Sequence, residues 1–348
     1  MTRSSLLCLL ALAGCNGEVP LPPEPPRTGL GFDTDGGVVR FDLDTGALLA
    51  RVDLQAGPIR DLAVDPFGGE VMVLEGDDDE GAVARRLSPD LVVLEEQPID
   101  GRVEAWFAPE GWWLFEETYG GERWRLAPST GEWSPALAAP VPRSLWRRPG
   151  IPVEGLGRDG DHAVALQLCG ATDLRRRPLP DVPWEARACP LDRGLALAHV
   201  EGEVLRLERH LGGERTAFAI PLPKSGRLRQ LLCLDDAVAA LVDGPPRLVV
   251  APLAASRASL GGSLTLPAPL ANSRRVATSM IPNGPDRLLV ATREGVVAVS
   301  LAANLRPELD RSFEGDTLRG PLTFVEETMA PDDKTDSIGP CGPPSPPR

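Results

Sequence analysis

The chain has 348 residues, of which 42% are apolar and 25% are charged, and these proportions exclude an intrinsically disordered protein. Its formal net charge of −14 argues against nucleic-acid binding, because an acidic surface repels phosphates. The length exceeds the usual size of one compact core, whereas a repeat fold escapes that limit because each unit packs only on its neighbours.

The chain begins with a segment that is typical of export signals. Arg3 supplies a positive charge, and residues 4–13 form an apolar run too short to span a bilayer. The sequence Leu12-Ala13-Gly14-Cys15 resembles a bacterial lipobox. The resemblance implies removal of residues 1–14, lipidation of Cys15 and a location in the bacterial cell envelope. An ordinary secretory signal is the alternative. Asn16, in place of an aspartate, favours the outer membrane over the inner membrane.

Two proline-rich segments flank the body of the chain. Residues 15–28 form a predicted tether whose sequence VPLPPEPPR is extended and semi-rigid. Residues 330–348 form a predicted tail without regular structure. The body, residues 29–329, is therefore expected to hold the folded domain.

The body consists of short apolar runs separated by turn residues. Each run has strand length and is bounded by Gly, Pro, Asp or Asn, and no long capped helical period is present. Examples are VVRFDLDTG (38–46), EVMVLEG (70–76), HAVALQL (162–168) and VVAVSL (296–301). The pattern predicts an all-β protein.

These runs recur with a period of 40 to 47 residues, which is typical of four-stranded propeller blades. The predicted inner strands cover residues 59–65, 103–108, 143–148, 186–191, 228–234, 274–280 and 321–326. Residues 29–54 supply three strands without an inner one, and residues 321–326 supply an inner strand alone. We therefore expect a closed β-propeller of about seven four-stranded blades, in which the N-terminal strands complete the last blade. The segment 149–190 fits this pattern worst.

The repeats also carry a family resemblance. Residues 38–76 and 287–301 resemble repeats of the YVTN or YncE-like propellers, and residues 124–133 resemble the repeat of quinoprotein-like propellers, including BamB-type outer-membrane lipoproteins. Ser129 replaces the usual aspartate of that last repeat. The resemblance implies a propeller fold and says nothing of activity, since these motifs encode hairpin turns.

Four cysteines follow Cys15, and an even number in an exported chain predicts disulfides. They are Cys169, Cys189, Cys233 and Cys341, which allow three pairings. We favour Cys169 with Cys189, which would close a loop of proline and arginine, and Cys233 with Cys341.

The motifs that could carry chemistry are better explained as turns. Residues 155–160 match G-x-G-x-x-G but precede a strand, whereas a dinucleotide site needs a helix there. Asp44-Thr45-Gly46 resembles one aspartic-protease triplet, yet the second triplet is missing. The acidic segment 33–37 lacks the third ligand and the glycine spacing of a calcium loop. The segment 75–80 holds five carboxylates that could bind a hard cation weakly, but a solvated turn is favoured. We expect no metal site, no cofactor and no catalytic residue.

Aromatic and basic residues gather in the middle of the chain. Six of the seven tryptophans lie within residues 106–146, and three consecutive arginines follow in the segment 149–190. Packing between blades is the default explanation for the tryptophans, and a solvated loop is the default for the arginines. The alternative is a partner surface on an irregular, disulfide-braced loop. Its candidates are Trp112, Trp113, Trp146, Arg175, Arg176 and Arg177.

The sequence therefore predicts a lipid-anchored envelope propeller that acts as a non-catalytic binding or scaffold protein for an envelope protein or a glycan. The alternative is a propeller lactonase or hydrolase with an ion at the channel mouth. A purely structural envelope protein is the third hypothesis.

Overall fold

The computed structural model describes residues 27–54, 59–65, 69–77, 81–99, 102–108, 111–118, 121–127, 137–138, 144–146, 154–168, 174–191, 194–211, 214–234, 237–253, 261–270 and 280–325. The predicted signal segment, nearly all of the tether and the tail lie outside these residues. Within them, no helix is long and apolar enough to cross a membrane. Every regular element there is a β-strand, which confirms the all-β prediction.

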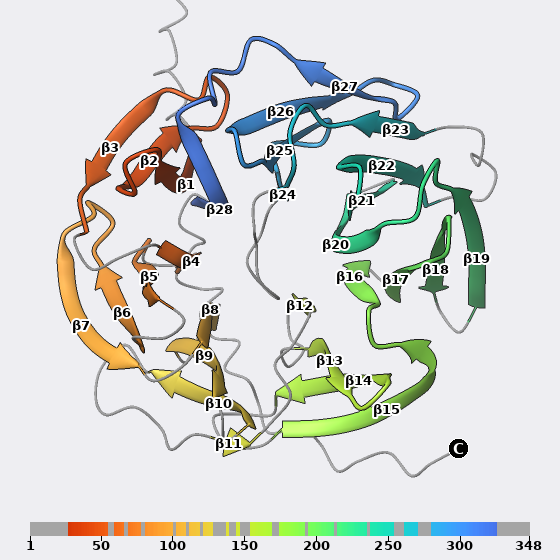
Figure 1. Cartoon of the computed structure of the whole chain (residues 1–348), viewed down its shortest axis with the longest axis horizontal. Helices are drawn as coiled ribbons and strands as arrows, with labels where there is room; N and C mark the ends of the chain where they lie inside the picture. The colour runs from red at the N-terminus through yellow and green to blue at the C-terminus, as the bar shows by residue number, and fades with distance from the viewer. Residues whose placement is uncertain are drawn as a thin grey trace, which may run out of the picture.

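The strands form seven four-stranded antiparallel sheets arranged around a ring (Figure 1). Blade 1 contains β28 (Leu318–Val325), β1 (Thr28–Asp33), β2 (Val38–Asp42) and β3 (Leu48–Val52). Blade 2 contains β4 (Ile59–Val64), β5 (Val71–Asp77), β6 (Gly81–Leu87) and β7 (Val93–Ile99). Blade 3 contains β8 (Arg102–Ala108), β9 (Gly111–Thr118), β10 (Gly121–Ala127) and β11 (Leu137–Ala138). In each list the first strand lies nearest the centre of the ring.

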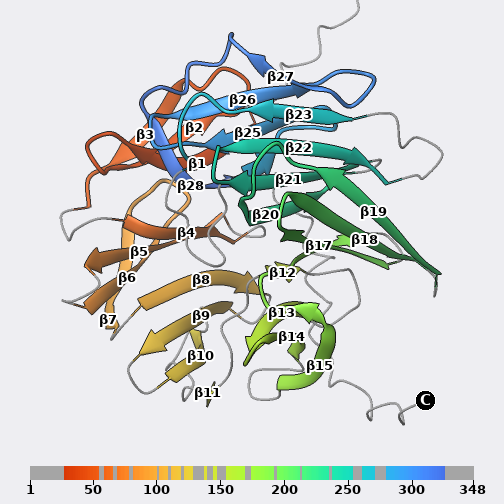
Figure 2. The same ribbon diagram turned by 45° about the vertical axis from the view of Figure 1, so that its right-hand side comes forward.

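The remaining four blades follow in chain order. Blade 4 contains β12 (Ser144–Trp146), β13 (Glu154–Asp159), β14 (His162–Leu168) and β15 (Leu174–Pro183). Blade 5 contains β16 (Arg187–Leu191), β17 (Gly194–Glu201), β18 (Val204–Leu211) and β19 (Glu214–Pro221). Blade 6 contains β20 (Arg227–Cys233), β21 (Ala237–Asp243), β22 (Arg247–Pro252) and β23 (Gly262–Thr265). Blade 7 contains β24 (Met280–Pro282), β25 (Arg287–Ala291), β26 (Val296–Leu301) and β27 (Pro307–Asp310). Figure 2 shows the strands of these sheets running side by side.

The two ends of the chain meet in blade 1. β28 pairs with β1 in antiparallel register, so that Thr28 lies opposite Val325 and Asp33 lies opposite Leu318. The inner strand of this sheet therefore comes from the C-terminal part of the chain and the other three come from the N-terminal part. The expected joining of the two ends is confirmed.

The hydrophobic core lies between blades. Alternate residues of β21 point to opposite faces, as in any strand. Val238, Ala240 and Val242 pack toward blade 5, and Ala237, Ala239 and Leu241 pack toward blade 7. A strand covered on both faces reads as a continuous apolar run, which explains the AVAALV sequence.

The segment 149–190 is more regular than expected. It contains β13, β14 and β15 and most of β16, so the prediction of an irregular loop was wrong. The G-x-G-x-x-G match falls on β13 and on the turn after it, where Gly160 has a φ of 59°. Prolines at 178, 180 and 183 made β15 hard to predict from the sequence. They are tolerated there because β15 is the outermost strand of its blade and needs few backbone N–H donors for pairing.

The Asp44-Thr45-Gly46 motif forms the turn between β2 and β3. The Asp42 carboxylate accepts hydrogen bonds from the backbone N–H of Asp44 at 2.9 Å and of Thr45 at 2.7 Å. Gly46 has a φ of 81°, and a Cβ there would lie 2.6 Å from the Glu314 carbonyl oxygen. The motif is a structural turn, as predicted.

Candidate functional site

All inner strands begin at the same end of the ring. The seven blades repeat one up-and-down order, so their inner strands run parallel around the centre. Contacts join β28 to β4, β4 to β8, β12 to β16, β16 to β20, β20 to β24 and β24 to β28. The first residues of different blades are therefore brought close together at one end, although they lie far apart in sequence.

This end is rich in arginine, and we call it the arginine end. The first or second residue of the inner strand is an arginine in five blades: Arg319 in β28, Arg60 in β4, Arg102 in β8, Arg187 in β16 and Arg227 in β20. β20 adds Arg229. Arg143, Arg274 and Arg275 hold the equivalent places in the sequence of the other two blades and lie outside the described residues.

Backbone carbonyl groups hold two of these side chains in place. Arg187 is only 7% exposed, and its Nε donates to the Arg229 carbonyl oxygen of the next inner strand at 3.0 Å. The Nη1 of Arg319 donates to the carbonyl oxygens of Asp316 at 2.6 Å and Leu318 at 2.8 Å. These contacts fix the guanidinium groups without removing their charge.

The two arginines of β20 differ in their partners. The Nε of Arg229 donates to the Asp243 carboxylate at 2.8 Å. Arg229 is also the residue at which the register of β20 shifts against β21, and such bulges re-aim side chains. Arg227 is exposed and makes no hydrogen bond or ion pair with any residue in the described part of the chain. Among the arginines of this end whose side chains the structure describes, it is therefore the charge most available to a ligand.

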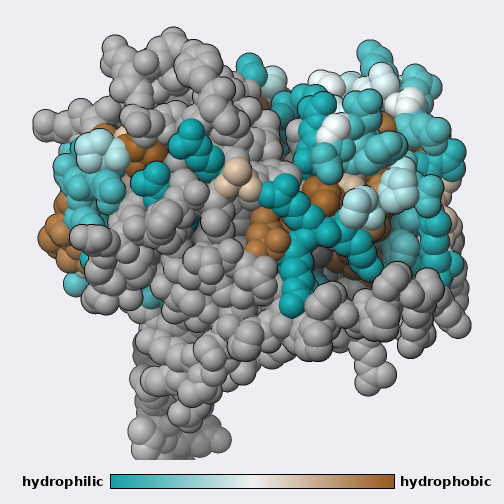
Figure 3. All heavy atoms as spheres, turned by 90° about the horizontal axis from the view of Figure 1, so that it is seen from below, coloured by the Kyte–Doolittle hydropathy of each residue, from teal (hydrophilic) through white to brown (hydrophobic). Residues whose placement is uncertain are grey.

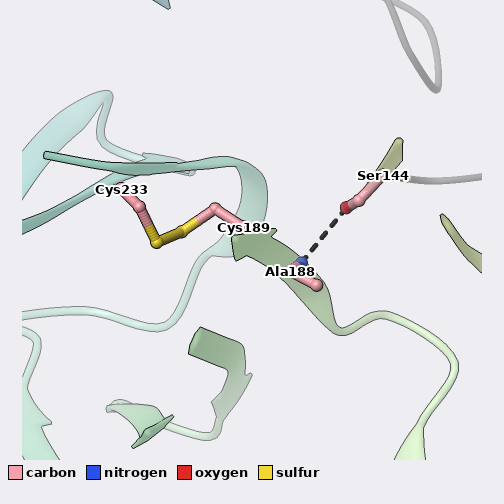
Figure 4. Close-up of a disulfide and its surroundings, with 4 residues drawn as sticks. All are labelled: Ser144, Ala188, Cys189 and Cys233. Carbon is pink, nitrogen blue, oxygen red and sulfur yellow. Dashed lines mark hydrogen bonds between the residues drawn. A yellow bond between two sulfur atoms is a disulfide. The ribbon is translucent and has the colours of Figure 1, made fainter. Parts of the chain in front are cut away.

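Further contacts join the inner strands to one another, although Cys233, the last residue of β20, lies at the opposite end. Gln230 of β20 bonds both backbone groups of Met280, at 2.7 and 2.9 Å. The hydroxyl of Ser144 accepts from the Ala188 N–H at 3.2 Å, and Cys189 forms a disulfide with Cys233, as Figure 4 shows.

The disulfide corrects the favoured pairing of the cysteines. Cys189 and Cys233 lie on neighbouring inner strands with their Cα atoms 5.5 Å apart. Both favoured pairs, Cys169 with Cys189 and Cys233 with Cys341, were therefore wrong, because the propeller places residues one blade apart side by side. Cys169 and Cys341 lie outside the described residues.

Acidic side chains surround the arginines at a greater distance from the centre. They belong to the ends of second strands and to the turns that follow them: Asp33, Asp35, Asp159, Asp161, Glu201, Glu203 and Asp243. Two of them pair with arginines outside the inner strands: Asp33 with Arg51 and Glu201 with Arg206. The inner-strand arginines are thus surrounded by both charges, an arrangement that favours a small anion over an extended polyanion.

Asp33 illustrates how these carboxylates are held. Its Oδ1 accepts from the Gly37 N–H at 2.8 Å and the Asp35 N–H at 3.0 Å, and its other oxygen pairs with Arg51. Burial raises the pKa of Asp33, but the bonds from Arg51 and the two amides outweigh it and hold the pKa below its usual value. The acidic segment 33–37 is therefore a turn, and its carboxylate is already satisfied.

We expect Asp33 to set part of the acid sensitivity of the fold. A carboxyl group whose pKa is lowered by folding stabilises the folded state at pH values above the usual aspartate pKa. This contribution disappears as the pH falls below about 4. Asp33→Asn should lower the free energy of unfolding at neutral pH by about 1.5–3 kcal/mol. Denaturant titration should show that difference shrinking on acidification; a difference that is constant with pH would contradict this.

The second acidic segment, residues 75–80, does not form a solvated turn along its whole length, contrary to our expectation. Glu75 is fully buried and lies 3.2 Å from Arg85, which also pairs with Glu96. Residues 78–80 of the segment lie outside the described residues. Across the part of the chain that the structure describes, no group of three His, Cys, Asp or Glu side chains could hold a metal ion.

Of the six residues of the predicted partner surface, the structure shows some exposed and one buried. Trp112 is 1% exposed and packs between blades 2 and 3, so it cannot belong to a surface. The side chains of Trp113 and Trp146 lie outside the described part. Arg176 and Arg177 are exposed on the outermost strand β15, and Arg176 donates to the Ala138 carbonyl oxygen of blade 3 at 2.6 Å. Arg175, Arg176 and Arg177 lie on a strand and not on a loop.

The arginine end was not predicted from the sequence, although a signal was present. Arginine recurs once per period at the start of each predicted inner strand, at positions 60, 102, 143, 187, 227, 274 and 319. Comparison of the starts of the repeats would have found it. A search for contiguous motifs could not, because each blade contributes one residue.

The fold and this end define a β-propeller in which arginines stand at the start of most inner strands. No family model matches the sequence, and no curated protein matches it. Solved structures are similar to it. A candidate 6-phosphogluconolactonase from Bacteroides uniformis has a TM-score of 0.63 and 11% identity, with 86% of this chain and 99% of that chain covered. A second, from Bacteroides fragilis, has a TM-score of 0.57 and 13% identity, covering 88% and 99%.

A third similar structure is the dihydro-heme d1 dehydrogenase NirN, with a TM-score of 0.55 and 14% identity, covering 84% of this chain and 65% of that chain. At such identities the likeness shows the propeller fold alone. It does not extend to the YncE-like or BamB-like families, nor to the lipoprotein signal, which remain predictions.

The comparisons correct the prediction that the chain is not an enzyme. The solved structures with this fold include candidate lactonases. The absence of a contiguous catalytic motif was the wrong criterion, since a propeller site draws its residues from several blades.

Proposed function

We propose that the protein is a propeller hydrolase of the lactonase kind, which acts on a small anionic lactone at the arginine end. The observation that supports this is the gathering of inner-strand arginines at one end of an otherwise acidic protein. Guanidinium groups bind carboxylate and phosphate groups through paired hydrogen bonds. The names of the similar structures point to phosphorylated sugar lactones as the substrate class.

The reaction needs no oxidant or reductant. Water adds to the lactone carbonyl, the ring C–O bond breaks, and the products are a carboxylate, a hydroxyl group and a proton. An arginine near the carbonyl stabilises the negative charge that develops on its oxygen. A second arginine holds the anionic substituent and orients the ring.

The test compares two lactones on the full chain. Proton release should be faster with 6-phosphogluconolactone than with gluconolactone, after subtraction of the uncatalysed rate. Arg227→Gln should raise KM about tenfold or more, in line with the 1.5–3 kcal/mol of a charged hydrogen bond, and should leave the melting temperature unchanged because Arg227 is exposed.

Arg215→Gln is the matched control. Arg215 lies on the outermost strand β19, 58% exposed, far from the inner strands. It should leave KM unchanged. Equal effects of the two variants, or no hydrolysis of either lactone above the uncatalysed rate, would contradict the proposal.

An envelope location with a lipid at Cys15 remains part of the proposed function. The outer membrane stays the favoured site because Asn16 follows Cys15. Binding of an envelope protein or a glycan through Arg176 and Arg177 also remains a proposal.

A further inference from the structure

Among the side chains that the structure describes, the exposed large apolar ones lie on one side of the ring. They lie on or next to the outermost strands β27, β3 and β7, which belong to the consecutive blades 7, 1 and 2. We call them the apolar rim: Leu309 (39% exposed), Leu48 and Leu49 (47% each), Val92 (60%), Val93 (38%) and Leu94 (50%). The described residues of blades 4 to 6 expose no large apolar side chain of this kind. Figure 3 shows apolar surface at the margin on the side where β7 lies in Figure 1.

Most of the apolar rim lies toward the end opposite the arginines. The four strands of a blade alternate in direction, so the outermost strand begins where the inner strand ends. Leu48 and Leu49 are the first residues of β3, and Val93 and Leu94 are the first residues of β7.

The N-terminal segment enters the ring at this same end. Thr28, the first residue of β1, pairs with Val325, the last residue of β28. The Arg27 carbonyl oxygen accepts from the Leu43 N–H at 2.9 Å, and its guanidinium lies 2.7 Å from Asp44. Both contacts are with the turn that leads into Leu48. The tether and the apolar rim therefore share one end and one blade.

We propose that the apolar rim rests on the lipid bilayer to which Cys15 is attached, with the arginine end facing away from it. The proposal relies on the lipobox-like sequence and is independent of the lactonase chemistry. Arg27 lies twelve positions after Cys15, and a proline-rich segment of that length reaches about 37 Å. Within this reach the bilayer is at a high effective concentration, so a weak apolar contact suffices.

Charge indicates which bilayer is preferred. The whole chain carries a net charge of −14, and Glu95 and Glu96, which follow the apolar residues of β7, offset the charges of Arg86 and Arg85. Contact with the bilayer therefore comes from insertion of apolar side chains and is opposed by anionic lipids. A neutral bilayer should bind the rim better than an anionic one.

The test places a photoreactive side chain at Leu49, at Val93 or at Arg215 in the lipidated full chain. The first two positions lie in the rim and the third lies in blade 5, away from it. The chain is reconstituted in phosphatidylcholine vesicles, with or without phosphatidylglycerol. Lipid adducts at positions 49 and 93 should exceed those at 215 by about tenfold, as expected for apolar side chains that leave water, and should fall when phosphatidylglycerol is added.

Three results would overturn the proposal. Equal adducts at all three positions would show that the rim has no preferred orientation. Adducts to a second copy of the chain would show that the rim is a protein interface. A mass of the full chain that shows no lipid on Cys15 would mean that the chain is not attached to the bilayer. Unchanged melting temperatures of the labelled chains would exclude misfolding as the cause, since these side chains are exposed.

Discussion

Removal of residues 318–348 should abolish cooperative unfolding of the protein. β28 lies within that segment, and without it blade 1 loses its inner strand and β1 gains an unpaired edge. Leu318 and Leu322, both fully buried, would also be lost, at about 1.5–3 kcal/mol each. Together these losses approach the whole stability of a typical domain. Calorimetry should show a broad transition or aggregation.

Removal of residues 326–348 is the matched control, because it leaves β28 intact. This shorter deletion should melt cooperatively at the temperature of the full chain. A cooperative melt of the longer deletion at the same temperature would show that the ring does not depend on its closure.

The double variant Cys189→Ala, Cys233→Ala should be the most destabilised of the cysteine variants. The disulfide closes a sequence separation of 44 residues, which corresponds to about 4 kcal/mol in the chain-entropy model. For a domain of this size we expect the melting temperature to fall by about 8 °C. The arginine end should loosen as well, since Arg187 and Arg229 lie on the same two strands.

Cys169→Ala with Cys341→Ala is the corresponding control. It should lower the melting temperature less than loss of the Cys189–Cys233 bond does, and it should leave that bond intact, which peptide mapping without reduction would show. A bond between Cys169 and Cys189, found by the same mapping of the unaltered chain, would contradict the pairing in the structure.

Much of the fold could be predicted from the sequence because propeller repeats are local patterns. The inner strands expected at 59–65, 186–191 and 228–234 match β4, β16 and β20 within a residue or two. The strand expected at 274–280 overlaps β24 only at Met280, and the rest of it lies outside the described residues.

The candidate site could not be predicted in the same way. Trp112 is a core residue because it is buried, and the residues that bury it include neighbours from another blade. The partner of Cys189 lies one whole blade further along the chain. The contact between Arg187 and the carbonyl of Arg229 also joins two blades. Each of these features depends on distances across the ring that a single segment does not contain.

The pairing of β1 with β28 has a consequence for the order of events during synthesis. β1 cannot pair with β28 until β28 has been synthesised, and their paired residues Thr28 and Val325 are 297 positions apart. Closing so long a loop costs about 5 kcal/mol in conformational entropy before any contact between the two strands offsets this cost. Blades 2 to 7 can form while the chain emerges, whereas blade 1 cannot be completed until synthesis has passed Val325. Blade closure is therefore expected to be the slowest folding step, and β1 is the strand most in need of a chaperone until then.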